Sequence, residues 1–181
     1  MTTDEQLVAL VQQGQKEWYG TLIERYEAKM FRYGKRFLSD AEDLNDIVQT
    51  VFVKAYINIK SFNLEMRFSP WLYRIAHNEL VNALKKKKRE PFFSFDVDTF
   101  LPHPVASEES DKESLDEDTK QMMDQFLEKL ESKYREPLIL FYYEELSYKE
   151  ISEILHIPVS TVGVRISRGK KVLRDMYDEL G

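Results

Sequence analysis

Residues 68–89 carry the side chains best suited to bind another molecule. Their sequence, FSPWLYRIAHNELVNALKKKKR, has the apolar spacing of one long helix. One side of that helix would collect an aromatic ring, two amides and two cations at steps of three or four residues: Trp71, Arg74, Asn78, Asn82 and Lys85. Cations neutralise phosphates, amides bond to base edges, and aromatic rings stack best on unpaired bases. The stripe therefore suits nucleic acid, although a solvated helix face with one partly buried Trp has the same pattern.

The ends of this helix have simpler explanations. Ser69 is expected to cap the first turn, and Pro70 suits the first helical position because its missing N–H would have no partner there. The run from Lys85 to Arg89 extends the cationic side, but cations also favour the C-terminal end of any helix through its dipole. The basic run alone is therefore weak evidence for a ligand.

A second candidate for nucleic-acid binding lies near the C-terminus. A capping box from Ser147 to Glu150 starts a short amphipathic helix, residues 156–160 (HIPVS) form a tight turn, and Ser160 is expected to cap a second helix. On that second helix the inward residues are apolar: Val162, Ile166, Leu173 and Tyr177. The outward residues are mostly polar: Val164, Ser167, Arg168, Lys171 and Arg174. This pattern is typical of a helix-turn-helix, although any capped helical hairpin resembles one.

A third candidate surface belongs to the helix expected from about Asp40 to Ile59. Its outward stripe mixes acids, an amide and aliphatics: Glu42, Asp46, Gln49, Val53 and Ile57. Two aliphatic side chains on a face with no core to build indicate a protein-docking surface. A merely solvated face is the alternative, because single exposed aliphatics are common.

These stripes need a helical framework, and the sequence predicts an all-α chain. Helices are expected from Thr3, from Glu17 to Leu38 with Trp18 among the core aromatics, and over 40–59 and 68–89, which makes a four-helix N-terminal unit. The loop over residues 60–67 is bracketed by Phe62 and Phe68. These two rings either plug a hinge or form a rim that holds an extruded base.

Composition and charge divide the chain into three parts. It has 181 residues, 43% of them hydrophobic, and a net charge of −6. Residues 1–93 hold 15 Lys and Arg against 12 Asp and Glu, residues 94–118 hold 1 against 9, and residues 119–181 hold 10 against 11. The acidity therefore belongs to a middle segment rich in Ser and Pro, which is expected to be a flexible linker between two helical domains.

The composition also narrows the chemistry. The chain has no cysteine, which excludes disulfides and thiolate sites, and its three histidines are too scattered to indicate a metal site. No apolar run approaches the roughly 18 residues of a membrane span, and the N-terminus lacks a cleavable apolar segment, so a cytoplasmic setting without membrane insertion is expected.

Three blocks together resemble bacterial RNA polymerase sigma factors of the extracytoplasmic-function (ECF) type, the minimal two-domain class of the sigma-70 family. They are DAEDLNDIVQTVFVKAY, FSPWLYRIAHN and LSYKEISEILHIPVSTVGVRISRGKKVLR, in the order and spacing of that family. The resemblance implies that residues 1–93 form the sigma region 2 domain, which binds the polymerase clamp and opens the −10 element. It also implies that residues 94–118 form the acidic linker and that residues 119–181 form the region 4 helix-turn-helix domain, which recognises the −35 element.

The resemblance also implies functional residues. The surface that binds core polymerase falls on Asp46, Gln49 and Val53. The −10 DNA-binding surface falls on the loop and the α-helical stripe: Phe62, Phe68, Trp71, Arg74, Asn78, Asn82 and Lys85. The −35 DNA-binding surface falls on the last helix: Ser160, Thr161, Val164, Arg165, Ser167, Arg168 and Lys171.

The implied partners are the beta and beta-prime subunits of the polymerase core, promoter DNA and an inhibitory anti-sigma factor, in a stress or envelope response. No catalysis, cofactor or metal is implied. This chain departs from the family at His156, where Gly is usual in the turn, although His tolerates the left-handed conformation. It also departs at Gly163 and Val164, where a cation or small polar residue is usual, which puts base recognition at those two positions in question.

Two other classes of protein remain to be weighed. An ordinary helix-turn-helix regulator would explain the C-terminal helices but has no need for an aromatic and amide stripe suited to unpaired bases. An enzyme could use four acidic residues near the start of one helix as metal ligands: Asp40, Glu42, Asp43 and Asp46. No His, Cys or second acidic cluster joins them, so the sequence disfavours this class.

Overall fold

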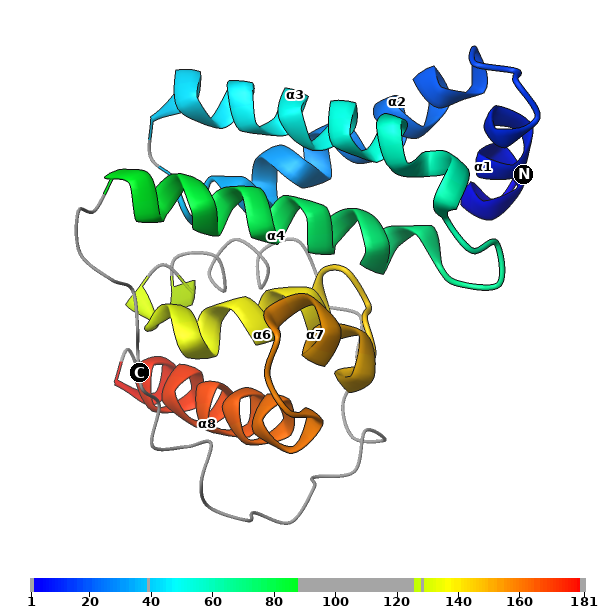
Figure 1. Cartoon of the computed structure of the whole chain (residues 1–181). Helices are drawn as coiled ribbons and strands as arrows, with labels where there is room; N and C mark the ends of the chain where they lie inside the picture. The colour runs from blue at the N-terminus through cyan, green and yellow to red at the C-terminus, as the bar shows by residue number, and fades with distance from the viewer. Residues whose placement is uncertain (1, 39, 88–125, 128, 180–181) are drawn as a thin grey trace. The chain divides into compact units, whose positions relative to one another are not determined.

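The computed structural model describes residues 2–38, 40–87, 126–127 and 129–179, and all regular elements in these ranges are helical. The all-α prediction is therefore confirmed for the described part of the chain. Two compact units are present, Met1–Phe93 and Ser94–Gly181 (Figure 1). The predicted acidic linker, residues 94–118, lies outside the described residues. None of the described helices is long and apolar enough to cross a membrane.

The first unit contains α1 (Asp4–Gln12), α2 (Trp18–Gly34), α3 (Ala41–Asn58), the short 3-10 helix η1 (Ile59–Ser61) and α4 (Phe68–Lys87). Local capping signals start two of these helices as predicted. Thr3 and Gln6 form the capping box of α1. Asp40 caps α3, where its Oδ1 accepts the backbone N–H groups of Glu42 and Asp43 at 3.0 Å each.

The core of the first unit forms between α1, α2, α3 and α4. Helices α3 and α4 run side by side in opposite directions (Figure 1). Leu72, Tyr73, Ala76, His77 and Leu80 are buried on α4, on a face wider than a single apolar stripe. The reason is that α2 covers a second side of α4. There the hydroxyl of Tyr33 lies 3.1 Å from Nδ1 of His77.

One predicted core residue of α2 is exposed. Trp18 is the first residue of α2, keeps 38% of its surface exposed, and donates its Nε1–H to Gln15 at 3.2 Å. The neighbouring Tyr19 is buried instead, and its hydroxyl donates to the carbonyl of Phe52 at 2.6 Å. The prediction that Trp18 is buried was wrong because Trp18 is the first residue of α2, and the buried residues of this helix start at Tyr19.

The second unit contains α6 (Ser132–Tyr142), α7 (Tyr148–Leu155) and α8 (Val159–Asp178), packed against one another (Figure 1). The capping box from Ser147 to Glu150 is present at the start of α7. His156 ends that helix in the left-handed conformation, with φ 54° and ψ 42°, so the turn forms as predicted without glycine.

Two expectations for the last helix are corrected. It begins at Val159 after Pro158, with no side-chain cap, so Ser160 lies inside the first turn and does not cap it. Tyr177 is 57% exposed rather than inward, because it lies in the last turn of α8, beyond the buried Leu173.

A glycine that the sequence did not single out allows α8 to lie close to α6. A Cβ atom added at Gly169 would lie 2.7 Å from Cδ1 of Leu138 and 3.3 Å from Cβ of Tyr134. Leu138 is buried, so its side chain would have to shift within the core to admit that atom. The close approach of the two helices therefore depends on the missing side chain at position 169.

Candidate nucleic-acid interfaces

The stripe on α4 lies where the periodicity placed it. Arg74, Asn78, Asn82 and Lys85 are exposed, and Trp71 is half-buried at the N-terminal end of the same side. The remainder of the basic run, from residue 88 on, lies outside the described residues. An aromatic ring, two amides and two cations thus share one accessible side of a helix, as contacts with bases and phosphates require.

Two aromatic rings hold Trp71 in place. Its ring centroid lies 5.1 Å from that of Phe62 and 5.6 Å from that of Phe68. Phe62 is 7% exposed and Phe68 is 1% exposed. The prediction that these two rings contact DNA is therefore corrected, because a buried ring cannot stack on a base. They form the floor against which Trp71 packs.

The loop between these rings presents other apolar side chains. Leu64 is 42% exposed and Met66 is 52% exposed. A tight turn shapes the loop, in which the side chain of Asn63 accepts the N–H of Glu65 and its carbonyl accepts the N–H of Met66, both at 3.0 Å. Apolar residues alternate through this loop at 62, 64, 66 and 68, and the alternation alone does not tell which pair faces outward.

The outward face of α3 is accessible as predicted. Asp46 and Gln49 are exposed, and the aliphatic side chains of Val53 and Ile57 are 58% and 69% exposed. A flank of the same helix is tied to α4 instead, by an ion pair of 2.6 Å between Lys54 and Glu79. Helix α3 thus has one side bound to its neighbour and one side with exposed aliphatics, which suits a partner protein.

The acidic residues at the start of α3 have a structural explanation, since the Asp40 carboxylate caps the helix. Among the residues that the structure describes, no group of three or more His, Cys, Asp or Glu side chains could hold a metal ion.

On α8 the predicted −35 residues divide into outward and inward sets. Ser160, Ser167 and Lys171 are exposed, and Val164 and Arg168 are partly exposed. Thr161 is only 3% exposed, so the prediction that its side chain contacts DNA is corrected. Thr161 lies beside the buried Val162 in the first turn of α8, which begins two residues earlier than a Ser160 cap would place it.

Gly163 also faces inward. It is buried, and a Cβ added there would lie 3.3 Å from Cε2 of Tyr148 on α7. The residue therefore serves the packing of α8 on α7, and its lack of a side chain follows from that contact.

Arg165 is half-buried and takes part in the electrostatics of the helix interface. Burial raises the pKa of the Glu136 carboxyl on α6 to about 7, against the opposing charges of Arg135 and Arg165. The guanidinium of Arg165 thus acts on Glu136 of α6, and its contact with −35 DNA stays a prediction.

We expect the pH dependence of stability in the second unit to reveal Glu136. Its pKa is raised on folding, so unfolding releases a proton, and the free energy of unfolding should fall as pH rises from about 4.5 to about 7. Glu136→Gln should remove that fall and stabilise the unit at pH 8 by about 1 to 2 kcal/mol, less than the full shift because the side chain is only half-buried.

Tryptophan fluorescence would report unfolding of the first unit only, because both tryptophans lie there. Hydrogen exchange of backbone amides in α6 and α8 measures the stability of the second unit instead. The control is Glu153→Gln, an equal charge change at an exposed position of α7. Equal stabilisation by Glu136→Gln at pH 5 and pH 8 would contradict the expectation.

An exposed stripe suited to unpaired bases in one unit and a helix-turn-helix in the other define a DNA-binding protein of transcription. The family models for Sigma-70 region 2 and for Sigma-70, region 4 match residues 22–90 and 120–173. The chain is 35% identical to the ECF RNA polymerase sigma factor SigW of Bacillus subtilis, covering 94% of each chain. It is 34% identical to the ECF RNA polymerase sigma-E factor of Haemophilus influenzae, covering 98% of this chain and 97% of that one. The chain belongs to the ECF RNA polymerase sigma factors.

Solved structures share the fold. The structure of CnrH in complex with the cytosolic domain of CnrY is 22% identical with a TM-score of 0.66, covering 97% of each chain. The sigma factor RpoE in complex with the anti-sigma factor NepR, from Bartonella quintana, is 24% identical with a TM-score of 0.64, covering 88% of this chain and 96% of that one.

Proposed function

We propose that this chain directs bacterial RNA polymerase core to specific promoters and starts strand opening there. It would act in the cytoplasm and have no catalytic step of its own. Residues 1–93 would bind core and the −10 element, and residues 119–181 would recognise the −35 element. Membership in the ECF sigma factors supports this proposal, since the named relatives are RNA polymerase sigma factors.

The observation that carries the proposal is the exposed stripe on α4, because its aromatic ring and amides suit bases that have left the duplex. The −10 surface would consist of this stripe and the exposed side chains of the neighbouring loop: Leu64, Met66, Trp71, Arg74, Asn78, Asn82 and Lys85. The −35 surface would consist of the outward residues of α8: Ser160, Val164, Ser167, Arg168 and Lys171. Core would bind the outward face of α3 through Asp46, Gln49 and Val53.

An anti-sigma factor is the other partner that we propose. The support is that one solved structure with the same fold, the sigma factor RpoE of Bartonella quintana, is in complex with the anti-sigma factor NepR. A protein of that kind would compete with core for exposed apolar side chains such as Val53 and Ile57.

The test is to mix the chain with bacterial core polymerase and a genomic or randomised promoter library and to sequence the transcripts. We expect new start sites that share two sequence elements at −10 and −35 spacing, and none with core alone. An ordinary helix-turn-helix regulator would bind its duplex without core and would create no start sites, and that result would reject the proposal.

The docking face of α3 gives a separate prediction. The double variant Asp46→Ala, Gln49→Ala should weaken core binding several-fold, while stability should change by no more than about 0.5 kcal/mol because both residues are exposed. A titrated pull-down with core measures the effect, and Asn58→Ala, an exposed position at the C-terminal end of α3 and on the opposite side from Gln49, is the control. Unchanged binding by the double variant would remove Asp46 and Gln49 from the docking surface.

A further inference from the structure

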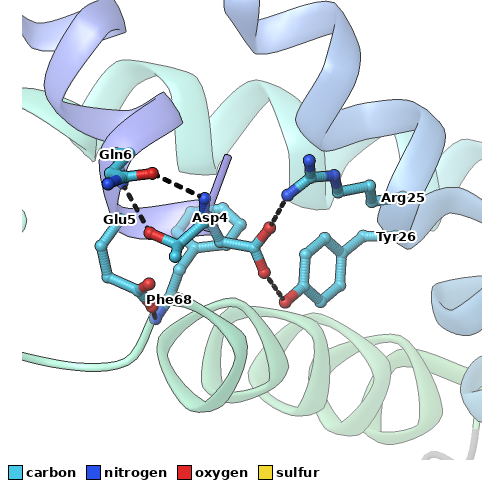
Figure 2. Close-up of polar contacts among 7 residues, drawn as sticks. Asp4, Glu5, Gln6, Arg25, Tyr26 and Phe68 are labelled. Carbon is cyan, nitrogen blue, oxygen red and sulfur yellow. Dashed lines mark hydrogen bonds and ion pairs between the residues drawn. The ribbon is translucent and has the colours of Figure 1, made fainter. Parts of the chain in front are cut away.

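Helix α1 holds both ends of the loop 62–68. At one end Gln12, the last residue of α1, donates its two amide hydrogens to the carbonyls of Ile59 at 2.8 Å and Phe62 at 2.9 Å. At the other end Oε1 of Glu5 accepts the N–H of Phe68, the first residue of α4, at 3.0 Å (Figure 2). The same short helix thus fixes the point where the chain leaves η1 and the point where it enters α4.

Helix α1 is itself firmly attached. The carboxylate of Asp4 accepts hydrogen bonds from Arg25, at 2.6 Å, and from the hydroxyl of Tyr26 (Figure 2). Burial and the contact with Asp4 raise the pKa of Tyr26 far above its usual value, so the hydroxyl remains a donor. The ring of Tyr26 also packs edge-on against Phe68, with 5.5 Å between centroids. A displacement of α1 would therefore be transmitted to the loop.

The two ends of the loop need opposite hydrogen-bonding groups, a donor at one end and an acceptor at the other. Two carbonyl oxygens need a donor with two hydrogens, which the primary amide of Gln12 supplies and a carboxylate lacks. The N–H of Phe68 needs an acceptor. The carboxylate of Glu5 supplies one at the positive end of the α4 dipole, and the side-chain oxygen of a glutamine at position 5 would also accept this bond. Ser69 was expected to cap this helix, but the helix begins at Phe68, two residues earlier than that cap would place it, and the N–H of Phe68 is bound by Glu5.

We infer that Gln12 and Glu5 are positioning residues for recognition of the −10 element. They fix the path of the loop, and so they fix where Leu64 and Met66 lie relative to Trp71 on α4. Neither belongs to the DNA-binding stripe, and each acts through the backbone of the loop. This inference rests on the proposed function of the loop and extends the −10 site to α1.

The test uses the full chain bound to core polymerase and a promoter library randomised at both elements. Gln12→Glu places oxygens against two carbonyls, and Gln13→Glu makes the same charge change at the next, exposed residue. We expect Gln12→Glu to weaken base preference at one or more −10 positions by about 5-fold or more, the range expected when a hydrogen bond is lost. Preferences at −35 and core affinity should be unchanged, and Gln13→Glu should match the wild type.

Three further variants guard against misfolding. Gln12→Ala removes both hydrogen bonds without adding charge and should have a smaller effect in the same direction. Glu5→Ala should weaken −10 preference, and Glu5→Gln should restore it, because Gln keeps the acceptor. A fall in total transcription that follows the thermal midpoint, with −10 preferences intact, would overturn the inference. So would equal −10 preferences in Gln12→Glu and Gln13→Glu. A wild type with no −10 preference would reject the proposed function itself, and the inference with it.

Discussion

Replacing Trp71 with alanine should reduce formation of the open promoter complex by roughly 10- to 100-fold, because a stacked base contributes about 1 to 3 kcal/mol. The side chain is half-buried on Phe62 and Phe68, and it shares one side of α4 with the exposed amides of Asn78 and Asn82. Bases can reach that surface only after they leave the duplex. Formation of the closed complex should therefore be spared.

Permanganate footprinting of unpaired thymines in the holoenzyme with promoter DNA measures this effect. Trp18→Ala is a matched control, since Trp18 is an exposed tryptophan on α2 and does not belong to the stripe on α4. Asn78→Ala should act in the same direction as Trp71→Ala. Normal thymine reactivity in the Trp71→Ala holoenzyme would count against the proposed −10 site.

The second large effect is expected at Arg168. It projects from the outward side of α8 and has the guanidinium that pairs with two acceptors of guanine. Arg168→Ala should cost about 1 to 3 kcal/mol of promoter binding and relax preference at one −35 position if the side chain contacts a base. A phosphate contact would give a smaller, sequence-independent loss and a shallower dependence on salt.

Binding of holoenzyme to −35 variants over a salt series distinguishes these contacts. Arg165→Ala is the contrasting variant, because Arg165 is half-buried and acts on Glu136 of α6. It should lower the stability of the second unit without changing which −35 bases are preferred. A larger change in base preference at Arg165 than at Arg168 would reverse the assignment of the α8 faces.

Local signals in the sequence were sufficient to predict most of the fold. Capping boxes at Thr3 and Ser147 start their helices as expected, and the left-handed turn at His156 forms. Errors occurred at helix ends, where Trp18 and Tyr177 lie in first or last turns with no helix packed over them. Helical periodicity gives the direction of a side chain but not how far the neighbouring helix extends.

The candidate sites were less predictable where partners are distant in sequence. The bonds from Gln12 to Ile59 and Phe62 span 47 and 50 residues, and the bond between Glu5 and Phe68 spans 63. No local pattern contains such pairs. No local pattern shows that position 169 needs glycine either, because that need comes from the contact with Leu138 on α6. The outward stripes were found because each lies on a single helix.

The long spans of these bonds also affect the order in which the protein forms. Contacts between distant residues require closure of large chain loops, which slows their formation relative to local helices. During synthesis α1 is made first, and Gln12 and Glu5 must wait for Ile59, Phe62 and Phe68 before they have partners. The loop 62–68 therefore acquires its shape only when the whole first unit has been made. A nascent or truncated chain that lacks either end would lack the fixed loop and, under the proposed function, would be unable to select the −10 element.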